Sequence, residues 1–135
     1  MASVFLVEDE VLIRMLVADM VTELGHAVAA EAGDLSSALD HANSAVFDMA
    51  VLDVWLGRDS IEPVANALAN RNIPFAFASG VGAEGVPEQF RERPRLQKPF
   101  AMAQLERCFV QLLAQAPTNA VTPRACLPGT SRPRA

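Results

Sequence analysis

Tyrosine is absent from this chain, lysine occurs once and cysteine occurs twice. Cys108 and Cys126 are too few for a disulfide scaffold or a zinc cluster, so a reducing cytoplasm is the expected location. No apolar run approaches the ~20 residues that a membrane-spanning helix needs. The first ten residues, MASVFLVEDE, lack a basic segment and already contain three acids, which is not expected of a secretory signal.

Positive charge is also scarce. The chain has 16 acidic and 11 basic residues, and every base except Lys98 is an arginine. Residues 117–135 carry three arginines and no acid, so residues 1–116 hold eight bases against 16 acids. A domain this acidic repels phosphate backbones, and we therefore expect binding to neither nucleic acid nor a membrane surface.

The 135 residues, of which 51 % are apolar, suit one globular domain. Short apolar runs alternate with segments of helical periodicity. Strands are expected near residues 4–7, 27–32, 49–52, 73–78 and 95–98, and helices near 13–24, 34–44, 63–69 and 101–115. This alternation predicts an α/β fold with a doubly wound parallel sheet, for which a flavodoxin-like strand order is one common choice.

Two segments depart from the alternation. Gly85 and Pro87 make the helix pattern at 84–92 marginal, because glycine costs about 1 kcal/mol and proline about 3 kcal/mol in a helix interior. Residues 117–135 are proline-rich and without periodicity, and we expect them to form a disordered tail after a domain of residues 1–116.

Four of the five expected strands end in polar side chains. Glu8 and Asp9 follow the first strand, Asp53 ends the third, Ser79 follows the fourth and Lys98 ends the fifth. Ligands of such sheets bind outside the carboxyl ends of the strands, so these side chains should converge. Each residue alone has a structural explanation: Glu8 and Asp9 as helix caps, Asp53 as a cap or turn residue, Ser79 as part of a turn and Lys98 as an exposed lysine. Four polar ends at one edge of one sheet favour a site.

The chemistry of this set is specific. Three carboxylates close together repel one another unless a cation relieves them, and an all-oxygen ligand set suits Mg²⁺. A lysine ammonium pairs with a carboxylate or a phosphoryl oxygen, and a serine hydroxyl donates a hydrogen bond to such an oxygen. The set therefore predicts a site that accepts a phosphoryl group on Asp53, where Mg²⁺ and Lys98 neutralise the developing charge.

The blocks FLVEDE, VLDVWL, PFAFASG and LQKPF resemble the signature blocks of the response-regulator receiver domain of two-component signalling. The resemblance covers residues 3–116 and implies a flavodoxin-like (βα)5 fold with strand order 2-1-3-4-5. It also implies that Asp53 takes a phosphoryl group from the phosphohistidine of a sensor histidine kinase or of a histidine phosphotransfer protein.

The resemblance assigns roles to the polar strand ends. It implies that Asp9 and Asp53 ligate Mg²⁺ directly, together with the backbone carbonyl of Trp55, and that Glu8 acts through a water molecule. It implies that Ser79 and Lys98 hold the phosphoryl oxygens after transfer. A cis peptide bond between Lys98 and Pro99 is a further implication.

The stretches PVANAL, IPFAFASG and EGVPEQFRERPRLQKPF resemble a receiver subgroup nicknamed FAT GUY, which consists largely of single-domain bacterial regulators. In the PFxFATGY motif of that subgroup, Ser79 replaces the threonine and Val81 replaces the tyrosine. Many receivers carry an aromatic switch residue three positions before the lysine, where this chain has Arg95. Switching through an aromatic ring at that position is therefore excluded.

The sequence argues against two other functions of an α/β domain and leaves one alternative. A phosphatase of the haloacid-dehalogenase kind needs a second aspartate two residues after the nucleophile, where Trp55 stands. A flavin- or nucleotide-binding domain needs a phosphate loop after the first strand, where three acids would repel the ligand. The remaining alternative is a pseudo-receiver that acts as a scaffold without phosphorylation. We expect a non-enzymatic regulator that signals through protein contacts or serves as a phosphate sink.

Overall fold

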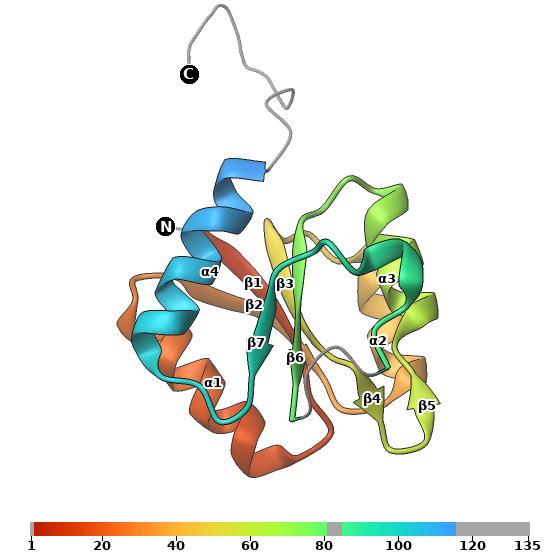
Figure 1. The fold of residues 1–135 in the computed structure, drawn as a ribbon, viewed down its shortest axis with the longest axis horizontal. Helices are drawn as coiled ribbons and strands as arrows, with labels where there is room; N and C mark the ends of the chain where they lie inside the picture. Colours follow the sequence, from red (N-terminus) through yellow and green to blue (C-terminus); the bar gives the residue numbers. More distant parts are fainter. Residues whose placement is uncertain (1, 81–84, 116–135) are drawn as a thin grey trace, which may run out of the picture.

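The computed structural model describes residues 2–80 and 85–115 of the chain. The expectations for Val81 and for the tail at 117–135 therefore lie outside the described residues. The described part is a five-stranded sheet with helices on both faces (Figure 1). The arrangement follows from the sequence pattern, because continuous apolar strands need cover on both sides.

The sheet has the order β2-β1-β3-β6-β7, and all neighbouring strands run parallel. Its strands are β1 (Ser3–Val7), β2 (Ala27–Ala32), β3 (Met49–Asp53), β6 (Phe75–Ser79) and β7 (Arg95–Gln97). Counted along the chain, the five sheet strands stand in the order 2-1-3-4-5. The flavodoxin-like α/β fold expected from the sequence is thus confirmed.

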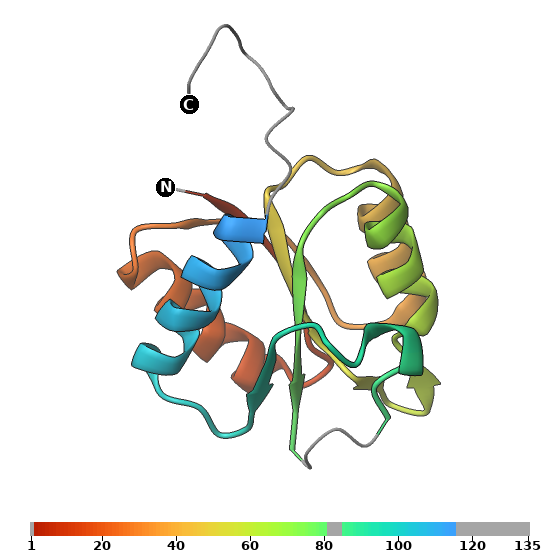
Figure 2. The same cartoon turned by 45° about the horizontal axis from the view of Figure 1, so that its top comes forward.

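Four α-helices cover the two faces of the sheet. They are α1 (Val11–Glu23), α2 (Leu35–Ser44), α3 (Glu62–Asn70) and α4 (Met102–Gln115), each within two residues of its expected bounds. Figure 2 shows α1 and α4 on one side of the sheet and α2 and α3 on the other. No helix in the described ranges is long and apolar enough to cross a membrane.

The central strands β1, β3 and β6 are the core of the domain. Alternate side chains enter opposite layers, so Phe5 and Leu52 pack toward α2 and α3, whereas Leu6 and Val51 pack toward α1 and α4. All four side chains are at most 4 % exposed. Burial on both faces explains why these strands are continuous apolar runs, and it gives the polar residues at their ends a rigid base.

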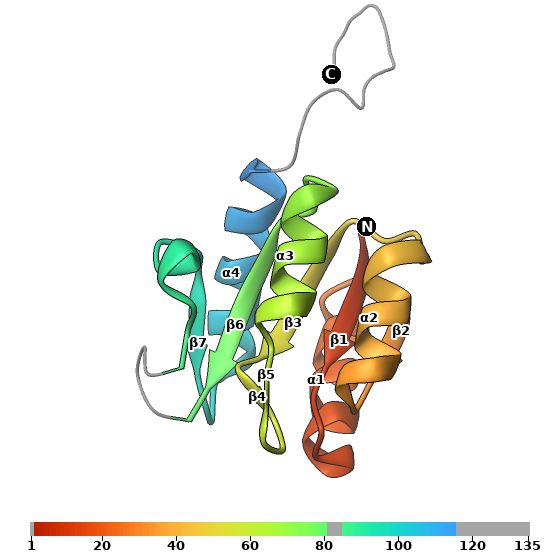
Figure 3. The same ribbon diagram turned by 90° about the vertical axis from the view of Figure 1, so that its right-hand side faces the viewer.

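A short hairpin that the sequence pattern did not predict follows β3. It consists of β4 (Trp55–Leu56) and β5 (Asp59–Ser60), which pair antiparallel. Gly57 in its turn has a φ of 63°, a conformation that glycine adopts without strain. The hairpin lies at the edge toward which the sheet strands point (Figure 3), so it forms one wall of the region around Asp53.

The helix that the sequence made only marginal at 84–92 does not form over the described residues of this segment. The only helical element between Gly85 and Pro94 is the 3-10 helix η1 (Glu88–Phe90), which Pro87 precedes. Gly85 has a φ of 89°, and a Cβ there would lie 2.5 Å from Nε1 of Trp55. The left-handed glycine and the proline together prevent a longer helix, which is the cost that the sequence had indicated.

Phe90 anchors this short segment to the core. Its ring lies 5.4 Å from that of Phe75 and 6.4 Å from that of Phe77, measured between centroids. The Arg93 guanidinium lies 4.4 Å from the Phe75 centroid and 5.6 Å from that of Phe90. Aromatic packing therefore covers this part of the core, which a third helix on this face would otherwise cover.

Replacing Phe90 with alanine should lower the free energy of unfolding by about 3 kcal/mol or more, because a buried aromatic side chain is lost and a cavity remains. Urea unfolding monitored by circular dichroism measures this change. Val110→Ala is the control, since Val110 is 65 % exposed and its truncation should cost less than about 0.5 kcal/mol. Equal losses in the two variants would show that Phe90 is not an anchor.

Candidate functional site

The polar residues predicted from the sequence meet at one edge of the sheet. Glu8 and Asp9 directly follow β1, Asp53 ends β3 and Ser79 ends β6. The register aligns these ends, because Val7 pairs with Leu52 and Asp53 pairs with Ala78. Lys98 directly follows β7 and is tied to the neighbouring strand, since its backbone N–H donates to the Ser79 carbonyl at 2.8 Å.

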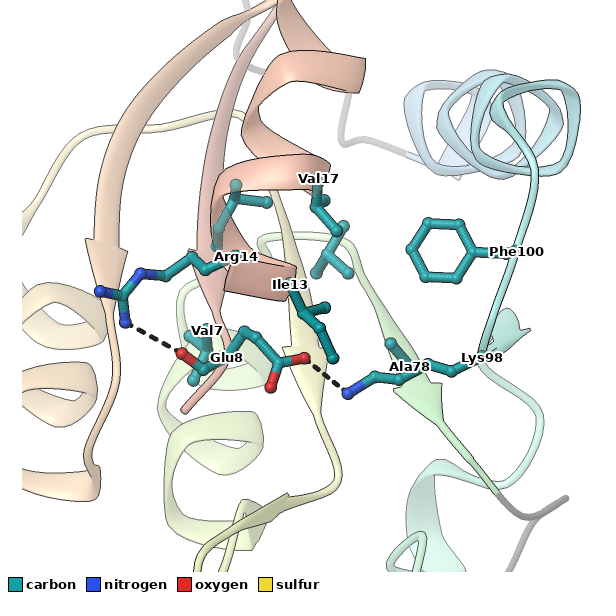
Figure 4. A pocket seen from close by; sticks show the side chains of 10 residues that line it. Val7, Glu8, Ile13, Arg14, Val17, Ala78, Lys98 and Phe100 are labelled. Atoms are coloured by element: carbon teal, nitrogen blue, oxygen red, sulfur yellow. Dashed lines mark hydrogen bonds and ion pairs between the residues drawn. The ribbon is translucent and has the colours of Figure 1, made fainter. Parts of the chain in front are cut away.

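Lys98 joins two of the carboxylates. Its Nζ lies 2.5 Å from Oε1 of Glu8 and 3.3 Å from Oδ1 of Asp53. The three side chains are 19 %, 8 % and 12 % exposed, so the charges sit largely out of water. Figure 4 shows the Lys98 and Glu8 side chains pointing toward each other across the strand ends. Removing one of these three charged side chains would leave another buried without its partner, which costs folding free energy.

The other carboxylate atoms are held by backbone amides. Oε2 of Glu8 accepts the N–H of Glu10 at 3.0 Å. Oδ2 of Asp9 accepts the N–H of Gly57 at 3.0 Å, which ties the acidic pair to the β4–β5 hairpin. Asp9 itself is exposed. The hairpin is therefore part of the site, although the sequence pattern indicated nothing about it.

The three acids lie close enough together to hold a metal ion. Glu8, Asp9 and Asp53 each offer a carboxylate oxygen, and these oxygens lie within 4.8 Å of one another. A small, all-oxygen donor set with one exposed side suits Mg²⁺, which keeps several of its water molecules. The residues present thus fit the expected ion. The ligand role of the Trp55 carbonyl and the phosphoryl role of Ser79 stay predictions, whereas the Lys98–Pro99 bond is cis as implied.

The site changes the acidity of its own carboxylates. Burial raises the pKa of Asp53 to about 7; the charge of Lys98 opposes this rise and the charge of Glu8 adds to it. Burial would lower the pKa of Lys98, but its hydrogen bond to Glu8 and the charge of Asp53 raise it above its ordinary value. The lone ammonium therefore stays charged, whereas without a metal ion Asp53 binds a proton near neutral pH.

Sequence reasoning missed Arg14. Its side chain reaches the backbone of Glu8 and lines a cavity of about 20 Å³, room for about one water molecule, together with Glu8 and Lys98. A single basic residue in a stretch of otherwise apolar helix positions was the available signal, but its contact with the strand end becomes visible only in the folded chain.

The raised pKa of Asp53 predicts a pH dependence of stability. A carboxyl group that binds its proton more tightly when folded contributes stability below its ordinary pKa of 3.8, and this contribution is lost as the pH rises through about 7. In EDTA, the wild type should therefore lose stability relative to Asp53→Asn over this range, as measured by urea unfolding. Parallel pH profiles of the two proteins would contradict the shift.

Comparisons with solved structures place the whole described fold among known regulators. The solution structure of SdrG from Sphingomonas melonis Fr1 is 38% identical, with a TM-score of 0.75, and the match covers 84% of this chain and 97% of SdrG. A BeF3-activated conformation of SdrG, from Pseudomonas melonis Fr1, is 39% identical with a TM-score of 0.70 and covers 82% and 95%. The REC domain of the PhyR response regulator from Erythrobacter litoralis has a TM-score of 0.74 at 23% identity, covers 90% and 96%, and shows the fold alone.

Sequence comparison agrees with the structural one. The transcriptional regulatory protein PdtaR of Mycobacterium tuberculosis is 31% identical over 106 residues, which are 76% of this chain. The chain spans about half the length of this curated relative, 52%. No protein-family model matches the chain. The fold, the acidic strand ends and an SdrG match that spans nearly all of that protein agree, and the chain belongs to the response-regulator receiver domains of two-component signalling.

Proposed function

We propose that this chain is a phosphorylated response regulator of the cytoplasm, which accepts a phosphoryl group on Asp53 from a sensor histidine kinase or a histidine phosphotransfer protein. Mg²⁺ is its cofactor, and its output is a protein contact or the removal of phosphoryl groups. The observation that carries the proposal is the position of Lys98 between Glu8 and Asp53, with Asp9 beside them.

The chemistry follows from these positions. An oxygen of the Asp53 carboxylate attacks the phosphorus, the bond to the nitrogen of the donor histidine breaks, and an acyl phosphate forms on Asp53. Bound Mg²⁺ supplies positive charge to the phosphoryl oxygens. Lys98 supplies the other positive charge, and Glu8 keeps this ammonium at the strand ends before transfer. Ser79, at the end of β6, donates a hydrogen bond from its hydroxyl to an oxygen of the transferred phosphoryl group.

The alternative is a pseudo-receiver that serves as a scaffold without phosphorylation. One observation favours it: the contact between Lys98 and Glu8 at 2.5 Å already neutralises both charges without a phosphoryl group. For phosphorylation, Lys98 has to exchange part of this contact for a phosphoryl oxygen. A direct labelling experiment separates the two functions.

Incubation with acetyl phosphate and Mg²⁺ should add one phosphoryl group to the wild type, read by intact mass, because Asp53 lies beside both Lys98 and the other two acids of the cluster. Asp53→Asn should gain none, since an amide is not a competent acceptor. Asp59→Asn is the matched control, because Asp59 lies in the adjacent hairpin with its side chain exposed, and this variant should label like the wild type. Labelling of Asp53→Asn, or no labelling of any protein, would contradict the proposal.

A phosphohistidine donor needs a surface beside the site, and α1 provides an apolar one. Four large apolar side chains of its first two turns are more than half exposed: Val11, Leu12, Met15 and Leu16. The helix begins two residues after Asp9, so a protein that covers this face reaches the edge that carries Asp53. Exposed apolar side chains grouped in this way are typical of contact surfaces.

Leu12→Glu should therefore slow phosphotransfer from an autophosphorylated kinase that labels the wild type by about tenfold or more, while labelling by acetyl phosphate stays unchanged. Radiolabel transfer and intact mass measure the two reactions. Val46→Glu is the control, because Val46 is 86 % exposed but precedes β3 at the opposite edge of the sheet. If both variants keep the wild-type transfer rate, α1 is not the donor surface.

A further inference from the structure

Arg14 connects the edge strand β2 to the acidic end of β1. It lies in the first turn of α1, and its Nη1 donates to the backbone carbonyl of Glu8 at 2.9 Å. Its Nε lies 3.2 Å from Oε1 of Glu31, and the two side chains are 20 % and 42 % exposed. Figure 4 shows the guanidinium group turned toward the main-chain oxygen of Glu8.

Gly33 leaves the space that this guanidinium occupies. A Cβ at residue 33 would lie 2.5 Å from Nη1 of Arg14, so any other side chain there would displace the guanidinium or be displaced itself. The glycine follows β2 directly, two residues after Glu31. Two residues of the β2 end thus set the position of Arg14, one by its charge and one by having no side chain.

The contact with Glu8 acts on the peptide group that links the two acids. The N–H of Glu8 donates to the Ala32 carbonyl at 3.0 Å, and its C=O accepts from Arg14. Because a peptide group is planar, holding this carbonyl also sets the direction of the Asp9 N–H and the angle at which the chain leaves β1. This hydrogen bond therefore restrains the backbone from which both carboxylates project.

We propose that Arg14 is a positioning residue for the acidic site. Glu31 aligns its guanidinium, Gly33 leaves room for it, and the guanidinium fixes the Glu8–Asp9 peptide so that both carboxylates face Asp53. This inference rests on the proposed function, since it names what holds the metal-binding carboxylates in place. A merely structural ion pair between Arg14 and Glu31, partly exposed, would contribute little to stability and leave the site unaffected.

The test is the affinity for Mg²⁺, measured by calorimetric titration of the whole chain and by the emission of Trp55, the single tryptophan. Arg14→Met should raise the Kd for Mg²⁺ about tenfold or more. Arg14→Lys should recover part of the loss, because an ammonium can still donate to the Glu8 carbonyl. Gly33→Ala should weaken Mg²⁺ binding with Arg14 still present, and this variant serves if Arg14→Met does not fold.

Arg71 is the matched control. Its guanidinium also donates to backbone carbonyls, those of Ala42 and Ala45 at 2.7 Å and 2.8 Å, but these lie at the end of α2 and make no contact with the site. Arg71→Met should lower the stability to urea and leave the Kd for Mg²⁺ within about twofold of the wild type. A Kd that changes equally in Arg14→Met and Arg71→Met would reduce the role of Arg14 to general stability and overturn the inference.

The outcomes also separate this inference from the proposed function. If the wild type accepts a phosphoryl group on Asp53 but Arg14→Met binds Mg²⁺ as tightly as the wild type, only the positioning role fails. If Mg²⁺ binding depends on Arg14 but acetyl phosphate never labels Asp53, only the proposed function fails. A wild type that binds no Mg²⁺ overturns both.

Discussion

The ammonium group of Lys98 is the contact on which the rest of the acidic edge depends. It reaches Glu8 after β1 and Asp53 at the end of β3, so one cation joins three strand ends that lie far apart in the sequence. Without it, the carboxylates of Glu8 and Asp53 would face one another without the cation that contacts both. The remaining local features, from the hairpin to the guanidinium of Arg14, orient groups around this contact.

The sheet makes this arrangement possible because it is rigid where the site needs it. β1 and β3 are central and buried on both faces, so the residues that follow them cannot shift without disturbing the core. The other parts that surround the site lie at the rim of the sheet. The hairpin holds Asp9 through the Gly57 amide, and the single turn of η1 replaces a helix beside the site.

Much of the site could be predicted, because its residues stand at strand ends and strand ends are visible in the sequence. Glu8, Asp9 and Asp53 do come together, and Lys98 meets two of them. Arg14, Gly33 and the hairpin could not be found in the same way. Arg14 acts on a carbonyl six residues earlier and on a side chain of another strand, and a backbone contact of this kind leaves no pattern of spacing.

The local residue pattern by itself determined the alternation of strands and helices along the chain, the two-sided burial of β1, β3 and β6, and the polar ends of the strands, since each is a local property of the chain. Glycine and proline in residues 85–87 also indicated that a full helix would not form there. Only the tertiary structure decided the distance from Lys98 to each carboxylate, the antiparallel pairing of Trp55 with Ser60, and the raised pKa of Asp53. These depend on burial and on contacts between residues distant in sequence, which exist only once the sheet has assembled.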